Sequence, residues 1–125
     1  MSEGMKVLTV YDPAQVPHET IADFLYWYDL TMEFVEDRDY DSTDGTAEVL
    51  LPWLTKAREE FPPKVDGADN TTRYIIGSTY IYARFADDVA DEAFARGQAR
   101  ARELGLGSYV AGSGQTVLPD GTVVA

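Results

Sequence analysis

The sequence has no cysteine and a single histidine. Without cysteine there can be no disulfide framework, no zinc–thiolate site and no cysteine nucleophile. His18 has no second histidine at metal-ligand spacing, so we expect it to be an ordinary surface residue. The longest apolar stretch, from Val49 to Leu54, is far shorter than the ~18 residues that a membrane span needs. The first residues show no signal-peptide pattern either, which favours a soluble, cytoplasmic protein with no membrane partner.

Basic residues are also scarce, because 10 Lys and Arg stand against 22 Asp and Glu, for a net charge of −12. Such a chain repels phosphate backbones, so we expect no nucleic-acid partner. Eight of the acids lie between Asp29 and Glu48, where Arg38 is the only base. This segment favours a basic protein as partner. The alternative is a solvated acidic surface that only keeps the protein soluble.

What the sequence does contain is a series of strand and helix patterns within 125 residues, a length that fits one domain over residues 1–125. Runs rich in β-branched and aromatic residues predict strands over 6–11, 72–76, 79–84 and 108–111. Apolar residues at helical spacing predict helices over 20–36, 47–60 and 86–104. Thr20 has the spacing of a helix cap, and Pro52 is tolerated only in a first turn, so we expect the second helix to start late, near Leu51. Small residues on one face of the third helix, among them Gly97, predict a close approach to the sheet. Gly77-Ser78 predicts a tight hairpin between the second and third strands. A terminal hairpin is predicted over 116–124.

The order of these elements predicts an α+β fold. We expect a single-domain, ferredoxin-like β-α-(α)-β-β-α-β antiparallel sheet with its helices on one face and a C-terminal β-hairpin. In this arrangement the helix over 47–60 is an insertion in the first crossover. The open face of the sheet could then be covered by a second copy of the chain, as a homodimer.

The first predicted helix has more apolar residues than one face can bury. Its predicted core face comprises Ile21, Leu25, Tyr28, Met32 and Val35. The remaining apolar residues are either covered by the next helix through Trp53, or stay partly exposed inside a border of carboxylates, as recognition surfaces often are. The candidate partner-binding residues are Tyr26, Trp27, Glu33, Phe34, Asp37, Asp39, Tyr40 and Asp41.

Two other patterns have competing explanations. Asp37, Asp39 and Asp41 begin like a calcium loop that would end at Glu48, but Ser42 stands where the sharp turn needs glycine. A solvated acidic loop is therefore favoured, with calcium as the alternative. Tyr80 and Tyr82 have the spacing of aromatic residues that stack on RNA, but the negative charge argues against RNA. We expect the C-terminal hairpin or a second subunit to cover them.

No set of residues points to a reaction. Gly112-Ser-Gly114 is too short for a phosphate-binding loop, and Ser113 has no catalytic triad around it. Among 22 acids some pairs are inevitable, and nothing singles one out. We therefore predict no catalytic residue, no metal ligand and no cofactor, which favours a binding protein over an enzyme.

At Tyr26-Trp27-Tyr28-Asp29, at Phe61-Pro62-Pro63, over residues 74–86 and over residues 104–109, the chain resembles a group of small acidic bacterial proteins. Some members of this group look like immunity proteins that accompany polymorphic toxins. The resemblance implies a stoichiometric inhibitor that occludes the active site of a toxin and performs no chemistry. It assigns no site residues.

The sequence therefore favours a non-catalytic binding protein, specifically an immunity protein that neutralises a cationic toxin domain. One alternative is a small-molecule-binding protein or small enzyme with a pocket between the sheet and the inserted helix. Another is a DNA-mimic inhibitor, which would need carboxylates spaced like phosphates over a long surface. Confinement of the acids to one segment argues against the mimic.

Overall fold

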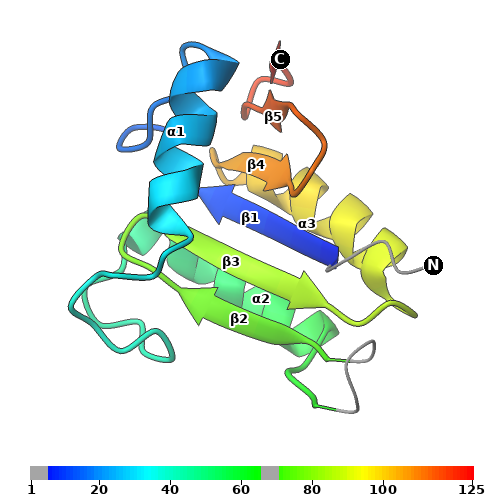
Figure 1. Ribbon diagram of the computed structural model, residues 1–125. Helices are drawn as coiled ribbons and strands as arrows, with labels where there is room; N and C mark the ends of the chain where they lie inside the picture. The colour runs from blue at the N-terminus through cyan, green and yellow to red at the C-terminus, as the bar shows by residue number, and fades with distance from the viewer. Residues whose placement is uncertain (1–5, 66–70) are drawn as a thin grey trace.

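The computed structural model describes residues 6–65 and 71–125, and these form one six-stranded antiparallel sheet with three α-helices (Figure 1). The predicted α+β class is confirmed. The order of strands across the sheet is β2-β3-β1-β4-β5-β6. The strands are β1 (Lys6–Tyr11), β2 (Arg73–Ile76), β3 (Tyr80–Phe85), β4 (Gly107–Val110), β5 (Thr116–Val117) and β6 (Val123–Val124). The helices are α1 (Ile21–Thr31), α2 (Leu51–Glu60, after a 3-10 turn over Glu48–Leu50) and α3 (Ala90–Glu103).

The sheet carries a different core on each face. Along β1, Leu8 and Val10 join the apolar core beneath α2 and α3, whereas Tyr11 joins an aromatic cluster beneath α1. Figure 1 shows α1 in front of the sheet and α2 and α3 behind it. The prediction that all helices share one face is therefore wrong. Its physical reason is that strands such as β3 are apolar on both sides, so each face needs its own helical layer.

The second predicted helix also has a different place from the expected one. α2 packs beside α3 and lies on the connection from β1 to β2, while α1 is the additional helix on the opposite face. Pro52 stands in the first turn of α2, where its missing N–H costs nothing, as expected from the sequence. The late start of the helix at Leu51 is confirmed.

α1 begins as predicted and ends early. The side chain of Thr20 accepts a hydrogen bond from the Asp23 N–H at 3.1 Å and caps the first turn. The helix ends at Thr31 rather than near residue 36, because the chain turns back at Phe34, whose φ of 52° lies in the left-handed region. Val35, predicted in the core, is consequently 78% exposed. The fully buried residue of α1 is Phe24, which the predicted core face left out.

The β2–β3 hairpin closes one residue later than predicted. The Gly77 N–H donates to the Tyr80 carbonyl at 2.9 Å, so Ser78 and Thr79 form the tip. A Cβ at Gly77 would overlap the ring of Tyr80. Glycine is therefore required here by a packed ring next to the turn.

Two backbone positions along the outer edge of β2 are already hydrogen-bonded to other segments of the same chain. The Ile76 N–H donates to the Tyr40 carbonyl at 2.8 Å. Thr72, just before β2, exchanges two hydrogen bonds of 2.9 Å with Lys64. The loop after α1 and the segment after α2 are thereby fixed along this edge.

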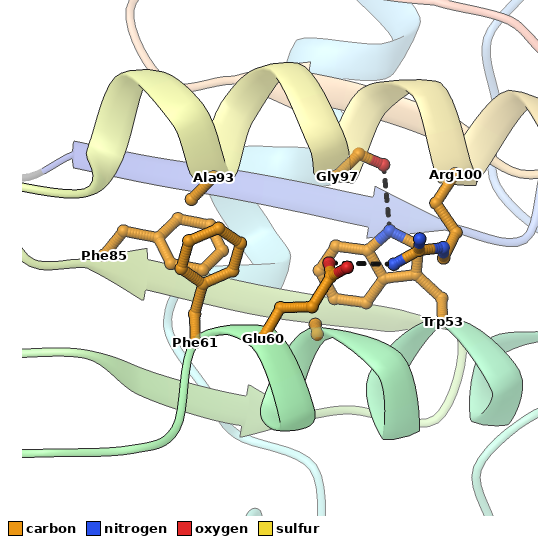
Figure 2. A pocket seen from close by; sticks show the side chains of 8 residues that line it. Trp53, Glu60, Phe61, Phe85, Ala93, Gly97 and Arg100 are labelled. Atoms are coloured by element: carbon orange, nitrogen blue, oxygen red, sulfur yellow. Dashed lines mark hydrogen bonds and ion pairs between the residues drawn. The ribbon is translucent and has the colours of Figure 1, made fainter.

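α2 and α3 are joined by one buried tryptophan. Trp53 is 1% exposed, and its Nε1 donates to the Gly97 carbonyl at 2.9 Å (Figure 2). A Cβ at Gly97 would lie 2.7 Å from Cδ2 of Leu8, so the absence of a side chain allows the helix to approach the sheet. Beside it, Glu60 accepts a hydrogen bond from Arg100 at 3.0 Å. The close approach predicted from the small residues of this helix is confirmed.

We expect Trp53→Phe to lower the free energy of unfolding by about 2–4 kcal/mol, because it removes a buried hydrogen bond and leaves a void. Trp27→Phe is the matched control, since the Trp27 ring is only half-buried and its Nε1 makes no hydrogen bond within the described residues. It should cost about 1 kcal/mol or less. Urea unfolding of both variants measures the difference. Equal losses would contradict the role given to Trp53.

The pair between Glu60 and Arg100 predicts a dependence on pH. The hydrogen bond from Arg100 holds the pKa of Glu60 below its ordinary value of 4.5. The resulting stabilisation is present above pH 4.5 and is lost as the pH falls through the lower pKa of the folded state. A double-mutant cycle with Glu60→Gln and Arg100→Gln should give a coupling of about 0.5–1 kcal/mol at neutral pH that vanishes in acid. The same coupling at both pH values would contradict this assignment.

Candidate partner-binding surface

The inner side of α1 is built of rings that pack on the sheet. Trp27 lies edge-on against Tyr80, with ring centroids 5.9 Å apart, and its centroid is 6.2 Å from that of Tyr11. Phe24 contacts the same cluster and Tyr109 at 5.1 Å. Trp53 belongs to the core on the far side of the sheet, so the second helix does not cover these rings. α1, rather than the C-terminal hairpin, covers Tyr80.

The outer side of α1 keeps apolar residues in solvent. Tyr26 is 70% exposed and Leu30, one turn further along, is 49% exposed. Glu33 follows at the next step and is exposed as well. Four apolar residues of this segment lie outside the predicted core face: Tyr26, Trp27, Leu30 and Phe34. Trp27 and Phe34 are half-buried against the sheet, whereas Tyr26 and Leu30 are exposed.

A clamp of three rings holds the turn after α1. The ring of Phe34 lies edge-on to Tyr40, at 5.6 Å, and to Tyr82, at 5.4 Å. The hydroxyl of Tyr40 accepts a hydrogen bond from the Glu36 N–H at 2.8 Å. Phe34 and Tyr40 were predicted to contact a partner directly, and both are half-buried. Their contribution is to fix the shape of the surface.

Arg38, the only base between Asp29 and Glu48, is used inside the loop. Its Nη2 donates to the carbonyl of Ser42 and to Oγ1 of Thr46, both at 2.9 Å. The guanidinium therefore organises the backbone of the acidic loop. It does not form an ion pair with the carboxylates around it.

In the part of the chain that the structure describes, none of the acids between Asp29 and Glu48 forms an ion pair. Glu33, Asp37, Asp39 and Asp41 are exposed. Within residues 6–65 and 71–125, all ion pairs lie on α2 and α3. They are Lys56–Glu59, Arg96–Glu60, Arg96–Glu92 and Arg100–Glu60. We call the exposed set the α1 surface. It consists of Tyr26, Leu30, Glu33, Val35, Asp37, Asp39 and Asp41.

The α1 surface contains five of the eight predicted partner-binding residues. Leu30 and Val35 were not among the candidates. The spacing of Tyr26 and Leu30, four residues apart on one helix, was the signal that could have found Leu30. Val35 was assigned to the core because the helix was extended one turn too far. No local pattern marks the turn at Phe34, which has neither glycine nor proline beside it.

The tyrosines near this surface are poor candidates for acid–base chemistry. Burial raises the pKa of Tyr28 to about 12, and it raises the pKa values of Tyr80 and Tyr82 as well. Each shift takes ionisation further from neutral pH. These hydroxyls therefore remain protonated at neutral pH.

Two further kinds of site were considered in the sequence. Among the described residues, no group of three or more His, Cys, Asp or Glu side chains could hold a metal ion. The hollow between α2 and α3, lined by Trp53, Phe85 and Gly97 among others, has a volume of about 10 Å³ (Figure 2). That is room for about one water.

No helix in the described ranges combines the length and the apolar character needed to cross a bilayer. No family model, curated protein or solved structure matches the chain. Arguments about function therefore start from the residues described above.

The strained turn gives a test of how the surface is held. At most positions glycine destabilises a chain relative to alanine, but a φ of 52° at residue 34 favours glycine. Both Phe34→Ala and Phe34→Gly lose the ring contacts with Tyr40 and Tyr82. We expect Phe34→Gly to be more stable than Phe34→Ala by about 1 kcal/mol in urea unfolding. The opposite order would show that the turn relaxes in the variants.

Proposed function

We propose that the protein is a non-catalytic binding protein whose α1 surface docks on a basic protein. Following the resemblance stated above, we propose that the partner is a cationic toxin domain and that binding occludes its active site. The proposal is carried by one observation. Exposed apolar side chains at Tyr26 and Leu30 share one segment of the chain with exposed carboxylates that form no ion pair among the described residues.

The composition of this surface supports docking over simple solvation. Large apolar side chains inside a charged border are typical of contact surfaces, in which a few anchors supply most of the binding energy. Tyr26 and Leu30 are suitable anchors because each is on the rigid outer side of a helix. Carboxylates around them attract a basic partner over a distance and speed its encounter.

The rigidity of the surface supports the same proposal. Phe34, Tyr40 and Tyr82 clamp the turn, and Arg38 holds the loop through two hydrogen bonds. A loop that is already ordered loses less conformational entropy when a partner binds. An acidic segment that only kept the protein soluble would need none of these contacts.

We further propose that the framework is ferredoxin-like. The order β2-β3-β1-β4, with α2 and α3 on one face, supports this description of the central part of the fold. α1 is then an addition to the other face, and β5 and β6 extend the sheet beyond β4. In this description α1, the proposed docking helix, is the element that a ferredoxin-like framework does not contain.

The class of partner can be tested with the protein encoded by a neighbouring reading frame. Expressed alone, this neighbour should arrest growth, and co-expression with the present chain should restore it. The purified pair should form a one-to-one complex in which the activity of the neighbour is lost. A neighbour that stays active in the complex would contradict occlusion of its active site.

The contribution of charge can be tested on the rate of association with this partner. We expect the triple variant Asp37→Lys/Asp39→Lys/Asp41→Lys to slow association at least about tenfold at low salt and to weaken its dependence on salt. The matched control reverses three exposed acids before and in the first turn of α3. It is Asp87→Lys/Asp88→Lys/Asp91→Lys. Stopped-flow measurements that show equal rates for both triple variants would contradict docking through the α1 surface.

A further inference from the structure

The exposed residues of α1 lie in one stripe along the helix. They are Ala22, Asp23, Tyr26, Asp29 and Leu30, and every other residue of the helix is buried or half-buried. At about 100° per residue, these five positions cover about a third of the circumference. The stripe faces away from the sheet, because the buried ring of Phe24 is on the opposite side of the helix.

Three apolar side chains form a row along the middle of this stripe. Ala22, Tyr26 and Leu30 follow one another at intervals of four residues. This is the spacing of the ridges by which helices pack, and such a ridge fits the groove between two ridges of a second helix. The small side chain of Ala22 leaves room for a close approach at the first end of the row.

Carboxylates border the row on both sides. Helical spacing places Asp29 on one side of the row and Asp23 on the other. Neither carboxylate forms an ion pair within the described residues. An element that covers the row should therefore bring cations to both borders of an apolar strip. A basic amphipathic helix has this composition.

Other occupants fit this stripe less well. An extended segment gains its affinity mainly by pairing with the edge of a sheet, and the outer side of a helix offers no such edge. A second copy of the chain would bring the Asp23 and Asp29 carboxylates of both copies together, at a net charge of −12 for each copy. The same charge repels an anionic membrane or a nucleic acid.

We infer that the element of the basic partner which docks on α1 is an amphipathic helix. Its apolar groove receives the row of Ala22, Tyr26 and Leu30, and its Lys or Arg side chains pair with Asp23 on one border and Asp29 on the other. The inference rests on the proposed docking function and names the part of the partner that the surface recognises. Asp23 and Asp29 then select the partner, whereas the carboxylates of the loop speed its approach.

The test uses two synthetic peptides with capped ends and the same composition of Lys, Leu and Ala. In the first, Leu recurs at helical spacing and Lys lies on both borders; in the second, the order is shuffled so that Leu falls on no single face. Each is titrated into the ¹⁵N-labelled full chain and followed by NMR. We expect the first peptide to bind saturably with a Kd below about 1 mM, to shift the amide signals of α1 and to become helical when bound. The shuffled peptide should bind at least about fivefold more weakly.

One pair of variants tests the apolar row. Tyr26→Ser should weaken binding of the helical peptide about fivefold or more, because Tyr26 is the largest side chain of the row. Val65→Ser is the matched control, since it removes an exposed apolar side chain outside α1 and should leave the affinity unchanged. Melting temperatures check that both variants are folded.

A second pair tests the borders of the row. The double variant Asp23→Asn/Asp29→Asn should weaken binding of the helical peptide about threefold or more at low salt. Asp87→Asn/Asp88→Asn removes the same charge from two exposed acids just before α3 and should have a smaller effect. Equal losses in the two double variants would show attraction by net charge alone and would contradict the pairing at the borders.

The inference is overturned if the helical peptide does not bind saturably, if the two peptides bind equally well, or if binding occurs without a gain of helix. Shifts centred outside α1 or an unchanged affinity in Tyr26→Ser would overturn it as well. The proposed function has a separate readout, which is the one-to-one complex with the neighbouring protein. A chain that forms this complex but fails the peptide test keeps the docking function and loses the helical partner element. A chain that forms no such complex loses the docking function itself.

Discussion

The fold depends on one constraint, which is that both faces of the sheet are apolar. In β1 and β3 the residues that point one way enter the core with Trp53, and on the other side Tyr11, Tyr80 and Tyr82 belong to the aromatic cluster with Tyr109. Neither face can be left to water, since burying this apolar area is the main source of stability. α2 and α3 cover one face, and α1 covers the greater part of the aromatic cluster on the other.

This constraint also explains why α1 has two apolar sides. Its inner side is committed to the aromatic cluster through Phe24 and Trp27. The outer residues Tyr26 and Leu30 have no other layer of the chain above them, because α2 lies on the far side of the sheet. The proposed docking surface thus follows from a single helix on a wide sheet.

The strands, the capped start of α1 and the late start of α2 could be predicted from the sequence, because each has a local cause. Thr20 caps its own helix, Pro52 restricts its own turn, and alternation is a property of one strand. The layer in which each helix lies could not be predicted, since β3 offers an apolar face to either side. The predicted core face of α1 was largely right, because Ile21, Leu25, Tyr28 and Met32 pack against the aromatic cluster. Phe24, the fully buried residue, was left out because both sides of this helix are apolar.

The candidate site could be predicted in part. The exposed acids were found because eight like charges in one segment cannot all be buried. The inward role of Arg38 depends on Ser42 and Thr46, and the turn at Phe34 depends on Tyr82, far along the chain. Contacts between distant parts of a chain are the information that local patterns lack.

The outer edge of β2 has a consequence for how the molecule can meet others. Its neighbours at Ile76 and Thr72 are already Tyr40 and Lys64 of the same chain. A foreign strand that tried to extend the sheet there would have to displace these bonds, so growth by backbone pairing is blocked on that side. At this edge, association is left to side chains. Pairing between backbones depends little on sequence, whereas contacts between side chains depend on it strongly. Single substitutions at the surface can therefore change which of several related partners is bound, while the fold stays the same.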